Sequence, residues 1–496
     1  MNKNADSNFL RTVKGFSSQT VVTIVLGVVE VIIFSVMSRL LTKEDFGYYS
    51  AMTAITVVFS SFSDTGIGSA IIQKKNINKQ YIDNAFTMCF IIGALLMLLL
   101  ICLAKPLSLA VVDTSLMIPL MFMSVTLLCN CLTSVNNSLM YKGLHFLKVG
   151  VVQLTAISVS GVIAITLAAN GFGFYAILTQ VVVASVLSFL LSYFVSGAKY
   201  HFYLSKKTSK EIWGFSGWLM ASAVFRNLAQ QIDNLMMPRL MSVEALGAYD
   251  RPRKFVEMSS SKFNSIFDIT LFPILSGIQD DKNAMKRAFD KILFFMGLAG
   301  TALFVLFFFN AELLIRIFLG EKWLNLTMLF RIFSIAIVFK VYGRLADCFL
   351  RSLAMTKYQF FFRIAEFIVK IPAIFIGVKW GLYGIAISVV MADIVMRLIK
   401  VWFVAAQIDY SVKEVLCRII ISGRSLLVIL PLIISLFLLL PHTVVGNILL
   451  AISSLCIYII VFFFLPSLVG SIYRDNIWNV VTKKIGINER IRKKCI

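Results

Sequence analysis

Apolar runs of about twenty residues recur along this chain, separated by short charged stretches, and they constrain its fold more than any other feature. A run of this length is what a helix needs to cross the hydrocarbon core of a bilayer. Hydrophobic residues make up 59% of the 496 residues and charged residues only 15%, whereas about a quarter of a soluble protein is charged. A water-soluble fold is excluded, and the runs are predicted to be membrane-spanning helices.

Apolar runs and charge breaks together predict an all-α polytopic membrane protein with about fourteen transmembrane helices. We expect two six-helix lobes, at 1–205 and 206–410, followed by a part at 411–496 with two more helices and a basic tail. The predicted spans are 17–37, 46–72, 84–104, 116–140, 150–169, 173–196, 214–237, 246–276, 290–309, 325–350, 359–379, 382–405, 419–440 and 445–467.

The charge distribution predicts the orientation of these spans. With the N-terminus inside, the loops on the cytoplasmic side carry several times more Lys and Arg than the loops on the other side, which places both termini in the cytoplasm. No cleavable signal is evident, so we expect the first span to stay in the mature protein. Topology accounts for the net charge of +22, and we expect no nucleic-acid partner. The basic tail is expected to contact anionic membrane lipids.

A repeat divides the chain into two similar halves. The stretch G-F-S at Gly15 to Ser17 recurs at Gly214 to Ser216, and S-R-L-L-T-K-E-D-F-G-Y-Y at Ser38 to Tyr49 returns as P-R-L-M-S-V-E-A-L-G-A-Y at Pro238 to Tyr249. An even number of spans separates equivalent points, so both halves enter the membrane with the same orientation. They should be related by a pseudo-two-fold axis along the membrane normal.

This arrangement is typical of a two-lobed transporter that opens the cleft between its lobes to each side in turn. The alternative is a duplicated structural or channel protein. Further along the chain, the repeat pairs Y-K-G-L at Tyr141 with L-R-S-L at Leu350, and Gly173 with Gly381. Arg39 and Arg239 are counterparts at the ends of the first and seventh spans; they are expected either to meet near the lobe interface or to anchor in headgroups.

Three stretches of the chain are distinctive. The first runs from Ser38 to Lys75 and includes D-T-G-I-G-S-A-I-I-Q-K-K from Asp64. The others are L-F-P-I-L-S-G-I-Q-D-D at Leu271 to Asp281 and L-I-R-I-F-L-G-E-K-W at Leu314 to Trp323. Together they resemble one known family, the WzxC-like polysaccharide exporters of the MOP (multidrug/oligosaccharidyl-lipid/polysaccharide) flippase superfamily. The similarity covers essentially the whole chain and occurs in the same order.

The resemblance implies a function. Members of this family are thought to flip undecaprenyl-pyrophosphate-linked oligosaccharide repeat units from the cytoplasmic to the periplasmic leaflet of the bacterial inner membrane. The units serve capsule, exopolysaccharide or O-antigen (lipopolysaccharide) assembly. The implied partners are this polyprenyl-linked substrate, membrane lipids, and a polysaccharide polymerase with its export machinery. The resemblance implies no catalytic residue and no cofactor.

Ionisable residues at membrane depth are costly, and they are distributed unevenly here. The first six predicted spans carry no Lys or Arg at depth, whereas the later spans carry many. A lipid pyrophosphate needs cations along its route, and the planar Arg fork suits phosphate because it donates two hydrogen bonds at once. The candidate pyrophosphate-binding residues are Arg226, Arg251, Lys254, Lys262, Arg331 and Arg344.

Several of these residues have a second interpretation. Arg251 and Lys254 fall on one helical stripe with Lys262, but they could equally snorkel to the outer headgroups. Arg226 forms a stripe with Gln230 and Asp233; we favour a cleft-facing position for it over one facing the eighth span.

Other charged residues are expected to neutralise one another. Arg344 has Asp347 three residues on, which could pair with it. Charges of alternating sign in the eleventh span (Arg363, Glu366 and Lys370) and in the twelfth (Asp393, Arg397 and Lys400) are expected to be structural pairs.

Two acids in the first half, Glu30 and Asp64, have no basic partner within their own spans. A carboxyl group at depth either has a raised pKa or binds a cation, which fits coupling to protons or sodium. One alternative is that neighbouring hydroxyls bond to them, as Ser60, Ser61 and Ser63 could for Asp64. Another is that Asp64 lies in a bend before Gly66 and Gly68.

Two rival functions remain. A multidrug exporter of the same superfamily would share the fold, but a cationic cleft repels the organic cations that such exporters carry. A polymerase or ligase acting on the same lipid-linked sugar should have a substantial periplasmic loop, and no predicted outer loop is long. The three histidines lie far apart, no nucleophile elbow or P-loop occurs, and the cysteines form no CxxC pair. We expect no enzymatic activity, no metal site and no cofactor.

Overall fold

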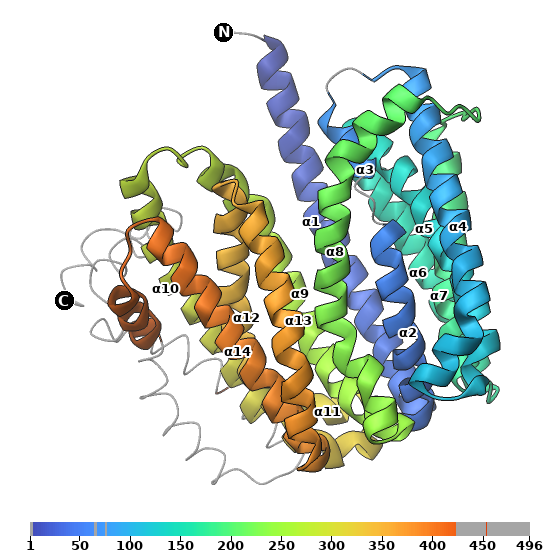
Figure 1. Cartoon of the computed structure of the whole chain (residues 1–496), viewed down its shortest axis with the longest axis vertical. Coiled ribbons are helices and arrows are strands. Elements are labelled where there is room, and N and C mark those ends of the chain that lie inside the picture. The colour runs from blue at the N-terminus through green and yellow to red at the C-terminus, as the bar shows by residue number, and fades with distance from the viewer. Residues whose placement is uncertain (1–2, 64–66, 75–76, 423–452, 454–496) are drawn as a thin grey trace. The chain divides into compact units, whose positions relative to one another are not determined.

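The computed structural model describes residues 3–63, 67–74, 77–422 and 453, and the regular structure in these residues is helical. Figure 1 labels the helices along the chain. They are α1 (Lys3–Leu40), α2 (Lys43–Ser63), α3 (Ile67–Gln73), α4 (Lys79–Val111), η1 (Thr114–Leu116), α5 (Met117–Lys142), α6 (Phe146–Ala169), α7 (Phe174–Ser196), α8 (Lys206–Leu240), α9 (Val243–Ser276), α10 (Lys282–Phe309), α11 (Ala311–Phe318), η2 (Glu321–Leu326), α12 (Thr327–Ser352), α13 (Thr356–Val378) and α14 (Gly381–Gln407).

The first twelve predicted spans all fall on helices, with the second divided between α2 and α3. By length and composition, eight of the described helices can cross a membrane, or nine with the pair α2 and α3 counted as one span. The predicted spans on α8, α9 and α13 are not among these helices. They carry many of the charges that were predicted to be functional or paired. A further helix begins after Ser411, and the predicted spans 419–440 and 445–467 lie almost wholly outside the described residues.

The described chain forms two compact units. The first contains Met1–Phe255, Arg316–Leu326 and Lys357–Ala392, and the second contains Val256–Ile315, Thr327–Thr356 and Asp393–Ile496. The predicted boundaries at 205 and 410 follow the sequence repeat and remain a prediction.

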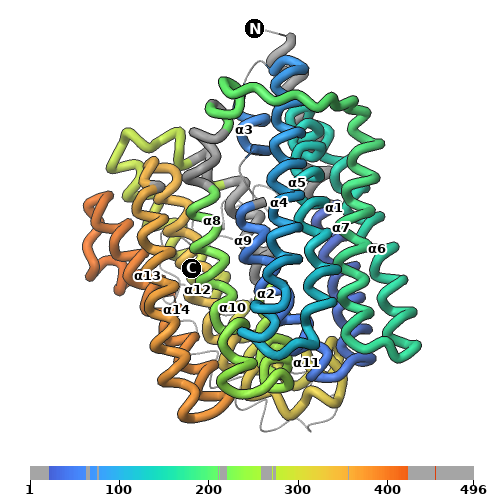
Figure 2. Tube along the Cα trace, turned by 45° about the vertical axis from the view of Figure 1, so that its right-hand side comes forward, coloured from blue at the N-terminus to red at the C-terminus, as the bar shows by residue number. Residues whose placement is uncertain are grey.

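In the first unit, α4, α5, α6 and α7 form one bundle, in which α5 packs against α4 and α7, and α7 against α6 (Figures 1 and 2). The helix α1 packs on α6 through two glycines. A Cβ atom added at Gly150 would lie 2.3 Å from Cγ1 of Val22, and one at Gly161 would lie 2.3 Å from Cδ1 of Ile33. Small residues let membrane helices approach closely in this way, and the closeness supplies van der Waals contact where water cannot drive association.

The repeat is visible in the turns that connect equivalent helices. The turn between α5 and α6 and the turn between α12 and α13 both contain a residue with positive φ, at 57° for Leu144 and 57° for Ala354. Their backbone hydrogen bonds match as well, since the amides of Gly143 and Leu353 each bond to the carbonyl four residues earlier. In the structure Leu144 therefore corresponds to Ala354. The sequence pairing of Tyr141 with Leu350 would pair Leu144 with Leu353, so it is one residue off.

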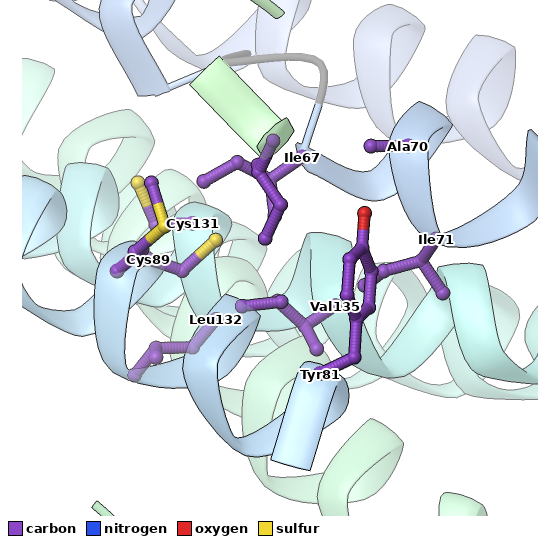
Figure 3. Packing of buried hydrophobic residues seen from close by; sticks show 11 residues of the cluster. Ile67, Ala70, Ile71, Tyr81, Cys89, Cys131, Leu132 and Val135 are labelled. Atoms are coloured by element: carbon purple, nitrogen blue, oxygen red, sulfur yellow. The ribbon is translucent and has the colours of Figure 1, made fainter. Parts of the chain in front are cut away.

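The family-like motif that begins at Asp64 forms part of the hydrophobic core (Figure 3). Ile67 and Ile71 on α3 are buried against α4 and α5. A Cβ atom added at Gly68 would lie 2.4 Å from the hydroxyl oxygen of Ser138, so only glycine allows α3 to lie this close to α5. Packing therefore explains much of this motif. Asp64, one of the two predicted coupling acids, lies outside the described residues.

Candidate functional site

Two hairpins of equivalent sequence meet within the first unit at what we call the inter-repeat junction, residues 34–53 and 233–255. A Cβ atom added at Gly47 would lie 1.9 Å from the carbonyl oxygen of Val243. Reciprocally, one added at Gly247 would lie 1.8 Å from the carbonyl oxygen of Lys43. A reciprocal contact between counterpart residues is the signature of a two-fold relation. It confirms the pseudo-symmetry that the repeat predicts.

Polar contacts at the junction obey the same symmetry. Ser50 donates a hydrogen bond from its hydroxyl to Asp250, its own counterpart, at 2.7 Å. Arg39, at the end of α1, donates to the carbonyl of Ile317 in the second half at 2.7 Å. Its counterpart Arg239, at the end of α8, donates to the carbonyls of Leu109 and Ala110 in the first half. Each arginine therefore binds the backbone of the other repeat, and the two do not hydrogen-bond to each other.

Arg251, a predicted phosphate ligand, is buried in this junction with 7% of its surface exposed. Its guanidinium donates to the hydroxyl of Ser38 at 2.9 Å and to the carbonyl of Phe34 at 2.9 Å. The same group lies 3.6 Å from the ring centre of Phe34 and 3.7 Å from that of Phe46, so it is stacked between two aromatic rings. In this conformation it binds the first repeat and does not snorkel to headgroups.

Other charged side chains of the inter-repeat junction also have partners within it. Arg253 forms an ion pair with Asp233 on α8, and the hydroxyl of Tyr249 donates to the same carboxylate at 3.0 Å. Asp233 is fully buried, so the preference for a cleft-facing Asp233 is wrong: this acid faces the eighth span, where two donors satisfy it. Asp250 also accepts a bond from Asn234, at 3.3 Å. The junction thus contains this ion pair, while Arg251 and Asp250 bond to uncharged groups, and the charges of these four residues balance.

The segment that joins α10 to α12 closes over the end of α1. It forms α11 and η2, where the sequence predicted only a loop. Trp323 is fully buried, and its indole N–H donates to the carbonyl of Ser38 at 2.9 Å. Lys322 donates from Nζ to the carbonyl of Arg39 at 3.0 Å and also to that of Leu41. Four residues of the L-I-R-I-F-L-G-E-K-W stretch (Arg316, Gly320, Glu321 and Lys322) line a pocket beside Arg39.

In the second unit, charges at membrane depth form pairs between and within helices. Lys400 on α14 lies 3.2 Å from Asp347 on α12, and both side chains are buried. Lys340 on α12 pairs with Glu257 on α9 at 2.9 Å. Removing one partner of the buried pair, Lys400 or Asp347, would leave an uncompensated buried charge, which is very costly, so each of these two residues depends on the other.

Within single helices, the expected pairs also form. Arg397 pairs with Asp393 at 3.0 Å, and on α13, in the first unit, Arg363 pairs with Glu366 at 2.8 Å. The predicted pairing is confirmed for these four residues, whereas the partner of Lys400 is Asp347 on another helix, α12.

Two predicted phosphate ligands on α12 have different surroundings. Arg331 is half-buried, with its guanidinium 5.9 Å from the ring centre of Phe308 and its Nε without a hydrogen-bond partner among the described residues. Arg344 is exposed, although it lies well inside a helix that crosses the membrane. Thirteen residues separate them, which is about 20 Å and about 220° on a helix. They cannot bind one pyrophosphate together.

The remaining predicted site residues are dispersed. Arg226 and Lys254 are half-buried on α8 and α9, and each makes a contact with other groups of the protein. Glu30 is half-buried on α1 and also has a partner. The side chain of Lys262 lies outside the described part of the structure. Within the described residues, no group of three or more His, Cys, Asp or Glu side chains could hold a metal ion.

Solved structures of similar fold belong to membrane transporters. The chain matches the lipid II flippase MurJ in its inward closed conformation with a TM-score of 0.63 and 16% identity, covering 90% of this chain and 98% of that one. It matches the inward-facing conformation of a MATE family multidrug resistance transporter of the MOP superfamily with a TM-score of 0.58 and 13% identity, covering 79% and 98%. These matches confirm the predicted two-lobed helical membrane fold.

Sequence relatives point to surface polysaccharides. The chain is 21% identical over 396 residues to the lipopolysaccharide biosynthesis protein WzxC of Escherichia coli K12, covering 79% of this chain and 80% of WzxC. It is 20% identical over 322 residues to the teichuronic acid biosynthesis protein TuaB of Bacillus subtilis, covering 64% and 66%. The model of the polysaccharide biosynthesis protein family matches residues 36–328, and this multi-span membrane protein belongs to that family.

Proposed function

We propose that this protein translocates polyprenyl-pyrophosphate-linked oligosaccharide repeat units from the cytoplasmic to the periplasmic leaflet of the bacterial inner membrane, with both termini in the cytoplasm. Membership of the polysaccharide biosynthesis protein family carries the proposal. The lipopolysaccharide and teichuronic acid relatives and the fold shared with a lipid II flippase support it. The translocated units would then pass to a polysaccharide polymerase and its export machinery.

Alternating access is the proposed mechanism. The inter-repeat junction holds the two repeats together at the end of α1 opposite the N-terminus, which is the periplasmic end in the proposed topology (Figure 1). For a path to open to that side, the contacts of Arg251 and the reciprocal contacts of Arg39 and Arg239 have to separate. We therefore place the junction in the closed periplasmic side of the transport cycle.

The pyrophosphate contacts are proposed to come from the cations outside this junction network. Arg344 is the strongest candidate, because a charged residue exposed on a transmembrane helix is stable only next to water or polar groups. Arg226, Lys254, Lys262 and Arg331 are the others. Arg251 becomes available to a ligand only after its bonds to α1 break.

The energy source is proposed to act through Glu30 and Asp64, the two acids of the first half. A carboxyl group that exchanges a proton or a sodium ion would link transport to an ion gradient. The variants Glu30→Gln and Asp64→Asn should then lose the response to an imposed proton or sodium gradient in vesicles. An unchanged response in both variants removes these residues from the coupling.

The test of the function is the lipid-linked oligosaccharide content of cells that lack this protein. On our proposal, undecaprenyl-pyrophosphate-linked repeat units accumulate and the surface polymer is lost, and both effects reverse when the gene is restored. The fold shared with multidrug transporters keeps drug export as the competing function. Normal lipid-linked intermediates together with increased drug sensitivity would favour that function instead.

A further inference from the structure

A pocket of about 400 Å³ lies beside the inter-repeat junction, and its lining is mostly cationic. It is lined by Arg39 at the end of α1, by Arg316 on α11, and by Gly320, Glu321 and Lys322 in the turn that follows. Three cations and one acid give this lining a net positive charge. Residues almost three hundred positions apart in the sequence form it, so no local pattern predicts the pocket.

Hydrogen bonds between the end of α1 and residues 317–322 fix the backbone around the pocket. Lys322 binds the carbonyl of Arg39 at 3.0 Å, and Arg39 binds the carbonyl of Ile317 at 2.7 Å. Gly320 has a φ of +101°, which favours glycine, and a Cβ atom there would lie 3.2 Å from Cγ of Arg39. A guanidinium carries five N–H donors, so the bond to Ile317 leaves Arg39 with donors for a ligand.

The cationic turn is not a requirement of the junction itself. Arg239, the counterpart of Arg39 at the end of α8, makes the equivalent bonds to the carbonyls of Leu109 and Ala110 in the first repeat. The turn that follows, 111–116, contains Asp113 but no Lys or Arg. The arginine contact therefore forms there without counterparts of Arg316 and Lys322, so the basic residues of the pocket are not needed for that contact.

Apolar side chains at this end point to a lipid as the ligand. Leu40, next to Arg39, is 43% exposed, and Ile317, next to Arg316, is 41% exposed. Exposed aliphatic residues beside Arg and Lys are typical of the level at which headgroups meet acyl chains. Arginine also binds phosphate through two parallel hydrogen bonds.

We propose that this pocket binds the phosphate group of a lipid. Its position at the periplasmic headgroups rests on the topology of the proposed function. Two lipids carry the required chemistry: the pyrophosphate of the translocated polyprenyl lipid as it leaves, and the phosphodiester of an anionic phospholipid. Their polar ends differ in charge and size, so binding measurements can separate them.

The experiment uses the full-length protein in phosphatidylcholine nanodiscs, titrated separately with undecaprenyl pyrophosphate and with phosphatidylglycerol. Arg316→Gln should weaken binding about tenfold, since the loss of a charge-assisted contact is worth about 1.4 kcal/mol or more. Arg316→Lys, which keeps the charge, should recover part of the affinity. Lys379→Gln, at an exposed lysine between α13 and α14, is the matched control and should bind like the wild type.

The outcomes separate the possibilities. Weaker binding of undecaprenyl pyrophosphate alone identifies the pocket as a site for the transported lipid, and equal weakening for both lipids identifies it as a phospholipid headgroup site. Wild-type affinity of Arg316→Gln for both lipids, at an unchanged melting temperature, overturns the proposal. If Arg316→Gln does not fold, Arg39→Gln replaces it and must meet the same criterion.

A flipping assay of the same proteins in sealed proteoliposomes separates this proposal from the proposed function. If the wild-type protein flips lipid and Arg316→Gln binds both lipids normally, only the proposed lipid-binding role of the pocket is refuted. Wild-type protein that binds lipid through Arg316 but does not flip refutes the function only.

Discussion

Replacing Arg251 should destabilise the protein through the inter-repeat junction. The guanidinium makes two hydrogen bonds to α1, to Ser38 and to Phe34, and lies between two aromatic rings. Hydrogen bonds to charged groups contribute about 1.5–3 kcal/mol each, and a desolvated cation–π contact about 2 kcal/mol. The desolvation cost of the buried charge offsets part of this, so we expect Arg251→Ala to lower the free energy of unfolding by about 3–5 kcal/mol.

Two further variants separate charge from packing. Arg251→Met keeps most of the volume between Phe34 and Phe46 and removes the buried charge, so it should cost less than Arg251→Ala. Arg251→Lys keeps the charge but not the planar fork, so it loses one of the two hydrogen bonds and the stacking geometry. The expected order of stability is wild type, then Met or Lys, then Ala.

The assay is reversible unfolding of purified protein in mixed micelles, followed by tryptophan fluorescence. Trp323, one of six tryptophans, is buried against Ser38 of the junction and contributes to this signal. Arg287→Ala, at an exposed arginine on α10, is the control for removing a positive charge. If Arg251→Ala unfolds at the same denaturant concentration as Arg287→Ala, the junction does not depend on the buried guanidinium and the reasoning fails.

Three other predictions follow from the structure. Gly47→Ala and Gly247→Ala should each lower the amount of folded protein severalfold, because the added Cβ atoms would lie 1.9 and 1.8 Å from carbonyl oxygens. Gly143→Ala should not, because its Cβ would lie 3.0 Å from the His145 side chain and 3.5 Å from the carbonyl oxygen of Leu139. Fluorescence-detected size-exclusion chromatography measures the amount of folded protein for each variant. Arg344→Gln should reduce export of surface polymer about tenfold at normal protein levels, because Arg344 is exposed on its helix. Arg397→Gln, at a half-buried arginine bonded to Asp393, should reduce export less, and equal export in the two variants would contradict the assignment of Arg344. The amide of Ser411 donates to the Glu414 carboxylate at 2.7 Å and lowers its pKa, so this helix start is stabilised above the ordinary pKa of a glutamate and loses that stability as pH falls through the lowered pKa. The protection factors at 412–416, which are the intrinsic exchange rates at each pH divided by the observed rates, should therefore fall on acidification in the wild type but not in Glu414→Gln.

The sequence predicted the spans and the symmetry because both depend on patterns that recur along the chain. Apolar runs report membrane crossing directly, and the repeat of S-R-L-L-T-K-E-D-F-G-Y-Y carried enough information to predict the pseudo-two-fold relation. Gly47 and Gly247 are matched positions of that repeat, and they meet each other's hairpin in the structure. Only the register at the turns of Leu144 and Ala354 was one residue off.

The partners of the buried charges could not be predicted in the same way. Arg251 bonds to Ser38 and Phe34, which lie 213 and 217 positions away, so its surroundings depend on how the helices pack. Helical periodicity placed Arg251 and Lys254 on one stripe but could not say which helix that stripe faces. For Asp233 the same uncertainty gave the wrong neighbour, because the two side chains that donate to it, Tyr249 and Arg253, come from α9.

The segment from Arg316 to Trp323 was also beyond sequence reasoning. It resembles the family in sequence, but the helix that leads into it, α11 (Ala311–Phe318), has only eight residues and is too short to be predicted as a span. Its function in the structure depends on contacts with the end of α1, almost three hundred residues earlier. The amphipathic pattern of A-E-L-L-I-R-I-F was the one local signal available.

Flipping by the purified protein tests the central claim most directly. Proteoliposomes are prepared with a fluorescent undecaprenyl-pyrophosphate-linked oligosaccharide in both leaflets, and a membrane-impermeant reagent quenches the outer leaflet. Our account predicts that the protected fraction becomes accessible in liposomes with wild-type protein and remains protected in protein-free liposomes, with slower transfer in those with Arg344→Gln. Equal protection with and without the protein, under an imposed proton or sodium gradient as well as without one, would contradict the account.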